Sequence, residues 1–443
     1  MKFWIITLCT ALSMHTIASE PLLDHSLAYK LTESLTVEVG PRIAGSQADQ
    51  RAVAWAQKSF KQLGYDKVWT EPFNMQYWER GNASLVVGAP FQQSLVVTAL
   101  GGSVGTPFDG VTAQVVMFDS LEQLQQASPL AVKDKIVFIN KSMAKDKLGS
   151  FYGQVVGARA QGAIEAAKLG AKAIIIRSVG TSINRFAHTG VMRYSDDVTR
   201  IPAAAISVPD AMQLQKMLSL QPELSMQLQM QNKLPGVTTS HNVIAEITGS
   251  KRPDEIVLIG AHLDSWDQGT GALDDGAGVG LVMAVGALIK QQGRPERTIR
   301  VVLFGNEEGG LIGARAYAAA HADQLSQHVY ASESDFGAGR IWQINSGVGE
   351  KSLSFVSELQ RQLQHLDIAA GTNSSSGGPD VSVLKALGVP VMSLQQDGTD
   401  YFDYHHTAND TFDKIDADAL AQNLKAWLIT TQAVANSDID LRQ

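Results

Sequence analysis

The spacing of hydrophobic positions changes along the chain and divides it into segments. Near the start, residues 26–37 and 47–63 carry apolar side chains at helical spacing, separated by a turn-rich loop over 40–46. A short strand is predicted at 67–73. These elements are expected to belong to a domain that the chain completes much later.

Short apolar runs of strand length dominate the next segment, residues 95–235. An alanine- and glycine-rich helix is expected at 157–169, and no cluster of metal-binding side chains occurs in this segment. Its lone histidine, His188, favours a structural role. We therefore predict an inserted accessory domain over 95–235. Its strands are expected at 94–100, 113–118, 135–139, 173–177 and 203–207.

The last segment, residues 236–443, alternates apolar strands with helices. This alternation predicts an α/β domain with a mostly parallel central sheet, to which residues 20–94 are expected to contribute. Sites in such sheets form at the carboxyl ends of the strands. Strands are predicted at 242–247, 255–261, 298–304, 327–333 and 389–394, and helices at 279–291, 313–320, 353–364 and 418–436.

The first residues have the pattern of a secretory signal peptide. Lys2 precedes an apolar run over 3–14, and small residues follow, so residues 1–19 are predicted to be removed after Ala18 or Ser19. The run is too short to cross a bilayer, and no later stretch is expected to be long enough. The predicted location is secreted or periplasmic, without a membrane anchor.

Composition narrows the function further. The 443 residues are 44% hydrophobic and 18% charged with a net charge of -8, which is typical of a soluble globular protein of about two domains. No basic run indicates a nucleic-acid partner. The single cysteine, Cys9, lies in the predicted signal peptide. A mature chain without it has neither a catalytic thiol nor thiolate metal ligands.

Two groups of polar side chains follow the strand predicted at 255–261. His262 ends this strand, and Asp264 is expected to accept a hydrogen bond from its imidazole and to orient it. Asp274 and Asp275 then stand between glycines at the start of an apolar helix. Adjacent acids there are expected either to cap the helix or to bridge two cations.

Further acids and imidazoles follow the later strands. Glu307 and Glu308 come after the most apolar strand, Asp335 after the next, and His405 and His406 after the last. Acids at the end of a buried strand are unfavourable unless they bind a metal or transfer a proton. Nitrogen and oxygen ligands without sulfur indicate a catalytic zinc site.

The order of these motifs resembles the co-catalytic dizinc aminopeptidases and carboxypeptidases. The shared motifs are His-x-Asp, Asp-Asp-Gly-Ala-Gly, Asn-Glu-Glu-Gly-Gly, Glu-Ser-Asp and His-Thr-x-x-Asp-Thr, and the resemblance covers nearly the whole mature chain. It implies a three-layer, phosphorylase/hydrolase-like zinc peptidase domain over 20–94 and 236–443, with a protease-associated-like insertion. It also implies a homodimer and a cis peptide bond between Asp274 and Asp275.

The resemblance implies two Zn²⁺ ions per chain and a ligand set for each. Asp274 would bridge the two ions. His262 and Asp335 would complete one site, and Glu308 and His406 the other.

Two further acids receive catalytic roles from the same resemblance. Glu307 would be the general base, and Asp264 would support the metal site from behind. His406 is preferred to His405 as the ligand because it begins the His-Thr-x-x-Asp-Thr pattern, and His405 is the alternative.

The predicted function is hydrolysis of short peptides or dipeptides by a secreted dizinc exopeptidase. One alternative is glutaminyl cyclisation, run on a related fold with a single zinc. Another is an inactive receptor or binding domain, although such a protein is expected to have lost ligands or the base. Which peptide terminus is recognised stays open at this point.

Overall fold

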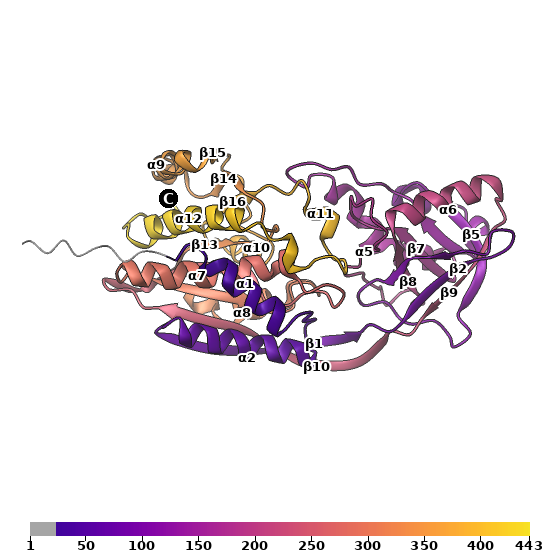
Figure 1. The fold of residues 1–443 in the computed structure, drawn as a ribbon, viewed down its shortest axis with the longest axis horizontal. Coiled ribbons are helices and arrows are strands. Elements are labelled where there is room, and N and C mark those ends of the chain that lie inside the picture. Colours follow the sequence, from indigo (N-terminus) through magenta and orange to yellow (C-terminus); the bar gives the residue numbers. More distant parts are fainter. Residues whose placement is uncertain (1–23) are drawn as a thin grey trace, which may run out of the picture.

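Two eight-stranded sheets organise the protein. The computed structural model describes residues 24–443, and the predicted signal peptide, 1–19, lies outside the described residues. Figure 1 shows the two sheets towards opposite ends of an elongated molecule, with strands β1 (Lys67–Glu79) and β10 (Lys233–Ile247) running side by side between them. The predicted α/β class is confirmed.

The first sheet has the order β1-β10-β12-β11-β13-β16-β14-β15. Its centre is parallel, because β11 pairs in parallel with β12 and β13, and β13 with β16. Antiparallel strands flank this centre, β10 beside β12 and β14 beside β16. The remaining strands are β11 (Arg252–His262), β12 (Arg297–Phe304), β13 (His328–Glu333), β14 (Ile341–Gly347), β15 (Ala369–Ala370) and β16 (Val391–Gln396).

Helices cover both faces of this sheet, which makes the predicted three layers. Val243 and Ala245 of β10 point into a core shared with helices α1, α2, α7, α9 and α12, whereas Ile244 points into a core shared with α8 and α10. The period of two along a strand produces this alternation. The helices are α1 (Leu27–Glu38), α2 (Gln47–Gln62), α7 (Ala277–Gln292), α8 (Ile312–Ala320), α9 (Leu353–Leu363), α10 (Val381–Ala386), α11 (Tyr401–Tyr404) and α12 (Ala417–Ala435).

Helix α7 corrects one expectation. Within residues 24–443, the stretch Ala272–Gln292 is long and apolar enough to cross a membrane, so the expectation that no later stretch reaches this length was wrong. All of its most apolar window is buried inside the protein. A helix that is buried on every side needs no polar face, so its composition matches that of a core helix.

The second sheet has the order β3-β2-β9-β5-β6-β7-β8-β4 and belongs to a unit spanning residues 83–230, called here the second unit. Strand β2 pairs with β9 in this sheet, although it precedes the predicted boundary at residue 95. The strands are β2 (Ala83–Val87), β3 (Ser94–Leu95), β4 (Val97–Ala99), β5 (Val111–Phe118), β6 (Ile136–Ile139), β7 (Ala173–Arg177), β8 (Ala203–Ile206) and β9 (Ser225–Met230). The helices are α3 (Leu121–Gln125), α4 (Pro129–Val132), α5 (Tyr152–Lys168) and α6 (Val208–Leu220).

Candidate active site

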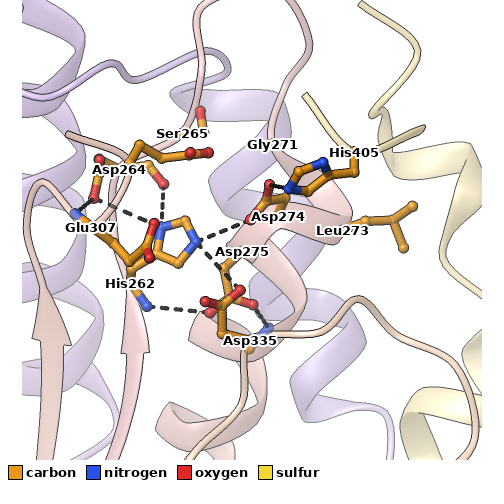
Figure 2. A network of polar contacts seen from close by, with 12 residues as sticks. His262, Asp264, Ser265, Gly271, Leu273, Asp274, Asp275, Glu307, Asp335 and His405 are labelled. Atoms are coloured by element: carbon orange, nitrogen blue, oxygen red, sulfur yellow. Dashed lines mark hydrogen bonds and ion pairs between the residues drawn. The ribbon is translucent and has the colours of Figure 1, made fainter. Parts of the chain in front are cut away.

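Three of the predicted site segments meet at one edge of the first sheet. His262 is the last residue of β11, Glu307 and Glu308 follow β12, and Asp335 follows β13. These three strands are parallel neighbours, so their carboxyl ends lie together. Figure 2 shows His262 between Asp264 and Glu307 on one side and Asp274 and Asp335 on the other.

Asp274 lies in the turn Ala272–Gly276, directly before α7. The carboxylate of Asp410 fixes this turn by accepting hydrogen bonds from the backbone N–H groups of Ala272, Leu273 and Asp274, at 3.0, 2.7 and 3.2 Å. Asp410 belongs to the His-Thr-x-x-Asp-Thr motif, but we did not predict its role. The bond between Asp274 and Asp275 is cis, as the resemblance implied.

The two carboxylate oxygens of Asp274 face two different groups. Oδ1 lies 3.1 Å from His262 Nε2, which is also 3.6 Å from Asp335 Oδ1. Oδ2 lies 3.2 Å from His406 Nε2, which is also 2.9 Å from Glu308 Oε2. All five predicted metal ligands therefore come together, and Asp274 stands between the two pairs.

The adjacent histidines His405 and His406 contact different sets of carboxylates. The Nε2 atom of His405 lies 3.7 Å from Asp274 Oδ2, and its ring stacks on that of His406 with centroids 3.5 Å apart. Only His406 also contacts Glu308 among the described ion pairs. The geometry favours His406 over His405, in line with its place in the motif.

Asp264 contacts the imidazole of His262 through its backbone oxygen and not, as expected, through its carboxylate. The Nδ1 atom of His262 lies 3.0 Å from the backbone oxygen of Asp264, whereas the carboxylate oxygen is 3.7 Å away. That carboxylate accepts a hydrogen bond from the backbone N–H of Glu307, at 3.0 Å. The sequence could not distinguish the backbone oxygen of Asp264 from its carboxylate as the partner of His262. Strand β11 ends at His262, and the turn beyond it decides where each oxygen points. Asp264 thus positions the segment that carries Glu307.

Opposite charges compensate one another in this buried cluster. Burial opposes protonation of His262, but Asp335, Asp264 and Asp274 outweigh it and raise the pKa of His262 well above its usual value. Burial likewise opposes ionisation of Asp274, yet His262 and His406 hold the pKa of Asp274 well below its usual value. Metal ligands bind in their deprotonated form, so a bound cation would take the place of the proton on each coordinating imidazole.

The residues present fit a divalent metal. Among the described residues, ligand atoms of Asp274, His262 and Glu308 all lie within 4.8 Å of one another, and so do those of Asp274, His405 and His406. The buried oxygen Oε1 of Glu308 has no hydrogen-bond partner among the described residues. Unpaired buried oxygens are unfavourable unless a cation or donor meets them. Oxygen and imidazole ligands without sulfur suit a catalytic metal with an open position.

Comparison with known proteins identifies the family of this chain. The model of peptidase family M28 matches residues 242–431. Human carboxypeptidase Q is 37% identical over 412 residues, covering 93% of this chain and 86% of its own. The chain belongs to peptidase family M28. Its relatives include carboxypeptidases and aminopeptidases, so the protein is a metallopeptidase of the exopeptidase type.

Solved structures support the same family and fold. The crystal structure of a Peptidase M28 precursor from Shewanella amazonensis SB2B is 52% identical with a TM-score of 0.93, covering 94% of this chain and 95% of that one. A zinc aminopeptidase from Bacillus subtilis, BSAP, has a TM-score of 0.68 at 21% identity over 95% of this chain and 98% of its own, which shows a shared fold.

A cavity of about 510 Å³ opens beside the cluster of this M28 peptidase. Its walls are mainly apolar and come from both units, with Trp78 and Ile312 on one side and Val191 on the other, and it reaches Asp264 and Glu308. A peptide side chain of ordinary size fits such a volume. The cavity therefore gives substrate a route to the cluster.

Trp266 links the cavity to the cluster. Its indole N–H donates a hydrogen bond to Glu308 Oε2 at 2.5 Å, and its ring lies against Gly101 of the second unit, where a Cβ atom would be 1.9 Å from Trp266 Cη2. Trp266 also lines the cavity itself. The same side chain therefore lines the substrate cavity and orients a predicted metal ligand, Glu308.

Replacing Trp266 with Phe is expected to lower zinc affinity about 10- to 100-fold. Phenylalanine retains most of the ring but loses the N–H that holds Glu308, and partners of this kind are usually worth that much. Titration with a competing chelator measures the change. Trp69→Phe is the matched control, because the Trp69 indole donates to Glu71 on β1, away from the cluster. Equal zinc affinity in the Trp266 variant and the control would contradict the role.

Proposed function

We propose that this M28 peptidase is a dizinc exopeptidase or dipeptidase that hydrolyses short peptides. The observation that carries the proposal is the position of Asp274, whose Oδ1 faces His262 and whose Oδ2 faces His406. A carboxylate between two ligand groups suits a bridge between two cations. His262 and Asp335 would hold one zinc, and Glu308 and His406 the other.

The protein residues supply positioning and proton transfer. Bound zinc lowers the pKa of a coordinated water and polarises the scissile carbonyl. Glu307 would accept the proton of the attacking water and return it to the leaving amine. Burial and the nearby carboxylates of Asp335 and Glu308 raise the pKa of Glu307 well above its usual value, which favours a carboxyl that holds a proton between the two steps. The hydrogen bond from its backbone N–H to Asp264 fixes the position of its segment.

Three further features belong to the same proposal. The second unit would be a protease-associated-like insertion that closes over the cluster. The N-terminal pattern supports export from the cytoplasm, and the motif resemblance supports a homodimer. N-terminal sequencing of the exported protein tests the export, and light scattering of the purified protein tests the homodimer.

The direct test combines a metal count with a peptide digest. We expect two zinc ions per chain in undialysed protein, and shortening of library peptides from one end that stops when a chelator is added. One zinc per chain with cyclisation of N-terminal glutamine would favour the cyclase alternative. Absence of both zinc and chelator-sensitive hydrolysis would overturn the proposal and favour a binding domain.

A further inference from the structure

The two candidate metal-binding histidines take their outer partners from different parts of the chain. His262 Nδ1 lies 3.0 Å from the backbone oxygen of Asp264, two residues further along the same loop. His406 Nδ1 faces the second unit, where the backbone oxygen of Thr189 lies 3.4 Å away. Arg159 Nη1 is also 3.4 Å from this nitrogen, but a guanidinium only donates and cannot accept the hydrogen of Nδ1. The second unit therefore supplies the acceptor for His406.

The backbone of His406 depends on the second unit as well. Its φ of 61° is left-handed, which is unfavourable for a residue with a Cβ atom and persists only where neighbours hold it. The N–H of Thr189 donates to the carbonyl of His406 at 2.9 Å, and His188 Nδ1 lies 2.7 Å from the carbonyl of His405. Among the described hydrogen bonds, these two carbonyls have no other donor. We call His188 and Thr189 the clamp.

His188 is fixed so that one ring nitrogen reaches the loop. A carbonyl oxygen only accepts, so Nδ1 of His188 carries the hydrogen and donates it to His405. The other nitrogen, Nε2, is buried without a hydrogen-bond partner among the described residues. The side chain is 1% exposed and packs on Gly180, where a Cβ atom would lie 2.2 Å from Cε1 of the ring. The position of Nδ1 is therefore the one that matters for the contact.

Arg80 fixes the other residue of the clamp. It lies in the connection between β1 and β2, and its Nη2 donates to Thr189 Oγ1 at 3.0 Å. Its Nε lies 2.8 and 2.9 Å from the two carboxylate oxygens of Asp267. Asp267 belongs to the loop that follows His262 at the end of β11. Arg80 thus holds Thr189 in place relative to the metal-binding cluster.

We propose that the second unit completes one of the two metal sites, because His188 and Thr189 hold His406 in the conformation that binds zinc. The inference rests on the proposed function and gives the second unit a role beyond covering the cluster. Partners behind a metal-binding histidine are usually worth about 10- to 100-fold in metal affinity. His262 takes its partner from its own loop. Loss of the clamp should therefore weaken the Glu308–His406 site and leave the His262–Asp335 site intact.

The test replaces His188 with three residues and counts zinc per chain under graded chelator. His188→Leu loses the donor, so the Glu308–His406 site should bind zinc about 10- to 100-fold more weakly. One zinc should then remain at a chelator concentration at which the wild-type protein retains two. His188→Asn places an amide N–H₂ group near the position of Nδ1 and should retain both ions. His188→Gln places it near the position of Nε2 and should behave like His188→Leu.

Two further variants complete the zinc measurement. His365→Leu is the matched control, because His365 Nδ1 also lies 2.7 Å from a backbone carbonyl, that of Gln362, but at an exposed position just after α9. The double variant His188→Leu/Asp335→Asn should lose both ions, since its two changes weaken different sites. Retention of one zinc by the double variant, loss of both ions from His188→Leu alone, or equal zinc binding by the Asn and Gln variants would overturn the proposal.

Amide hydrogen exchange tests the clamp without zinc. In the zinc-free protein, the amides of residues 401–407 should exchange faster in His188→Leu than in the wild type, whereas those of β11 should exchange alike. Unchanged exchange at 401–407, or faster exchange throughout the protein, would overturn the proposal and leave His188 with a general structural role. If the wild-type protein binds no zinc, the proposed function fails, whereas faster exchange confined to 401–407 still supports the clamp.

Discussion

Replacing Glu307 with Gln is expected to lower kcat by about 10²- to 10⁴-fold and to leave the zinc content unchanged. Glutamine has nearly the same shape and retains the backbone N–H that binds Asp264 at 3.0 Å, so the segment should stay in place. Its amide cannot accept the proton of an attacking water. The rate therefore falls without any loss of metal.

Steady-state kinetics and elemental analysis on the same preparation measure both effects. Glu350→Gln is the matched control, because Glu350 is exposed and lies in a short turn after β14, away from the cluster. Normal hydrolysis by the Glu307 variant would rule out its role as the base. Loss of zinc from this variant would show instead that Glu307 is a metal ligand.

Replacing Asp274 with Asn is expected to weaken both metal sites and to lower zinc affinity by more than about 10²-fold. Outer partners of metal ligands are worth about 10- to 100-fold, and a bridging ligand should exceed them. Asparagine offers one oxygen, and its amide N–H₂ group points hydrogens at the second cation. Activity should fall below detection because both sites depend on this side chain.

Zinc stoichiometry under graded chelator concentration distinguishes the bridge from an ordinary ligand. Asp335→Asn is the comparison, because Asp335 contacts His262 but no residue of the other pair among the described ion pairs. We expect the Asp335 variant to retain about one zinc per chain at a chelator concentration that strips the Asp274 variant completely. Retention of one zinc in both variants would show that Asp274 does not bridge.

Local pattern was sufficient to predict most elements of the first sheet. The strands predicted at 255–261 and 298–304 match β11 and β12, because strands buried on both faces are continuous apolar runs. Strands β14 and β15 of this sheet, and β2 and β9 of the second sheet, were not predicted. Strand β9 alternates buried and exposed residues, and the burial of β14 is irregular, so neither carries such a run. Their pairing depends on neighbours that are distant in sequence.

The sequence also determined which side chains the first sheet brings together. His262, Asp274, Glu308 and Asp335 follow strands or precede a helix in a fixed order, and parallel pairing brings consecutive strand ends to one edge. A motif at a strand end can be located from the neighbouring sequence, because the end of the apolar run marks the end of the strand. Their gathering at one edge therefore follows from that order once the sheet forms.

The tertiary structure alone decided which atoms meet. Three contacts depend on how the loops turn beyond the strand ends. They are the contact of His406, rather than His405, with Glu308, the backbone contact of Asp264 with His262, and the hydrogen bond from the Trp266 indole to Glu308. Arg159 is the clearest case. It lies in an unremarkable helix of the second unit, 247 positions before His406, and contacts its imidazole only because the two units pack together. Contacts at such separation leave no periodic signal in the sequence, because neither segment carries information about its partner.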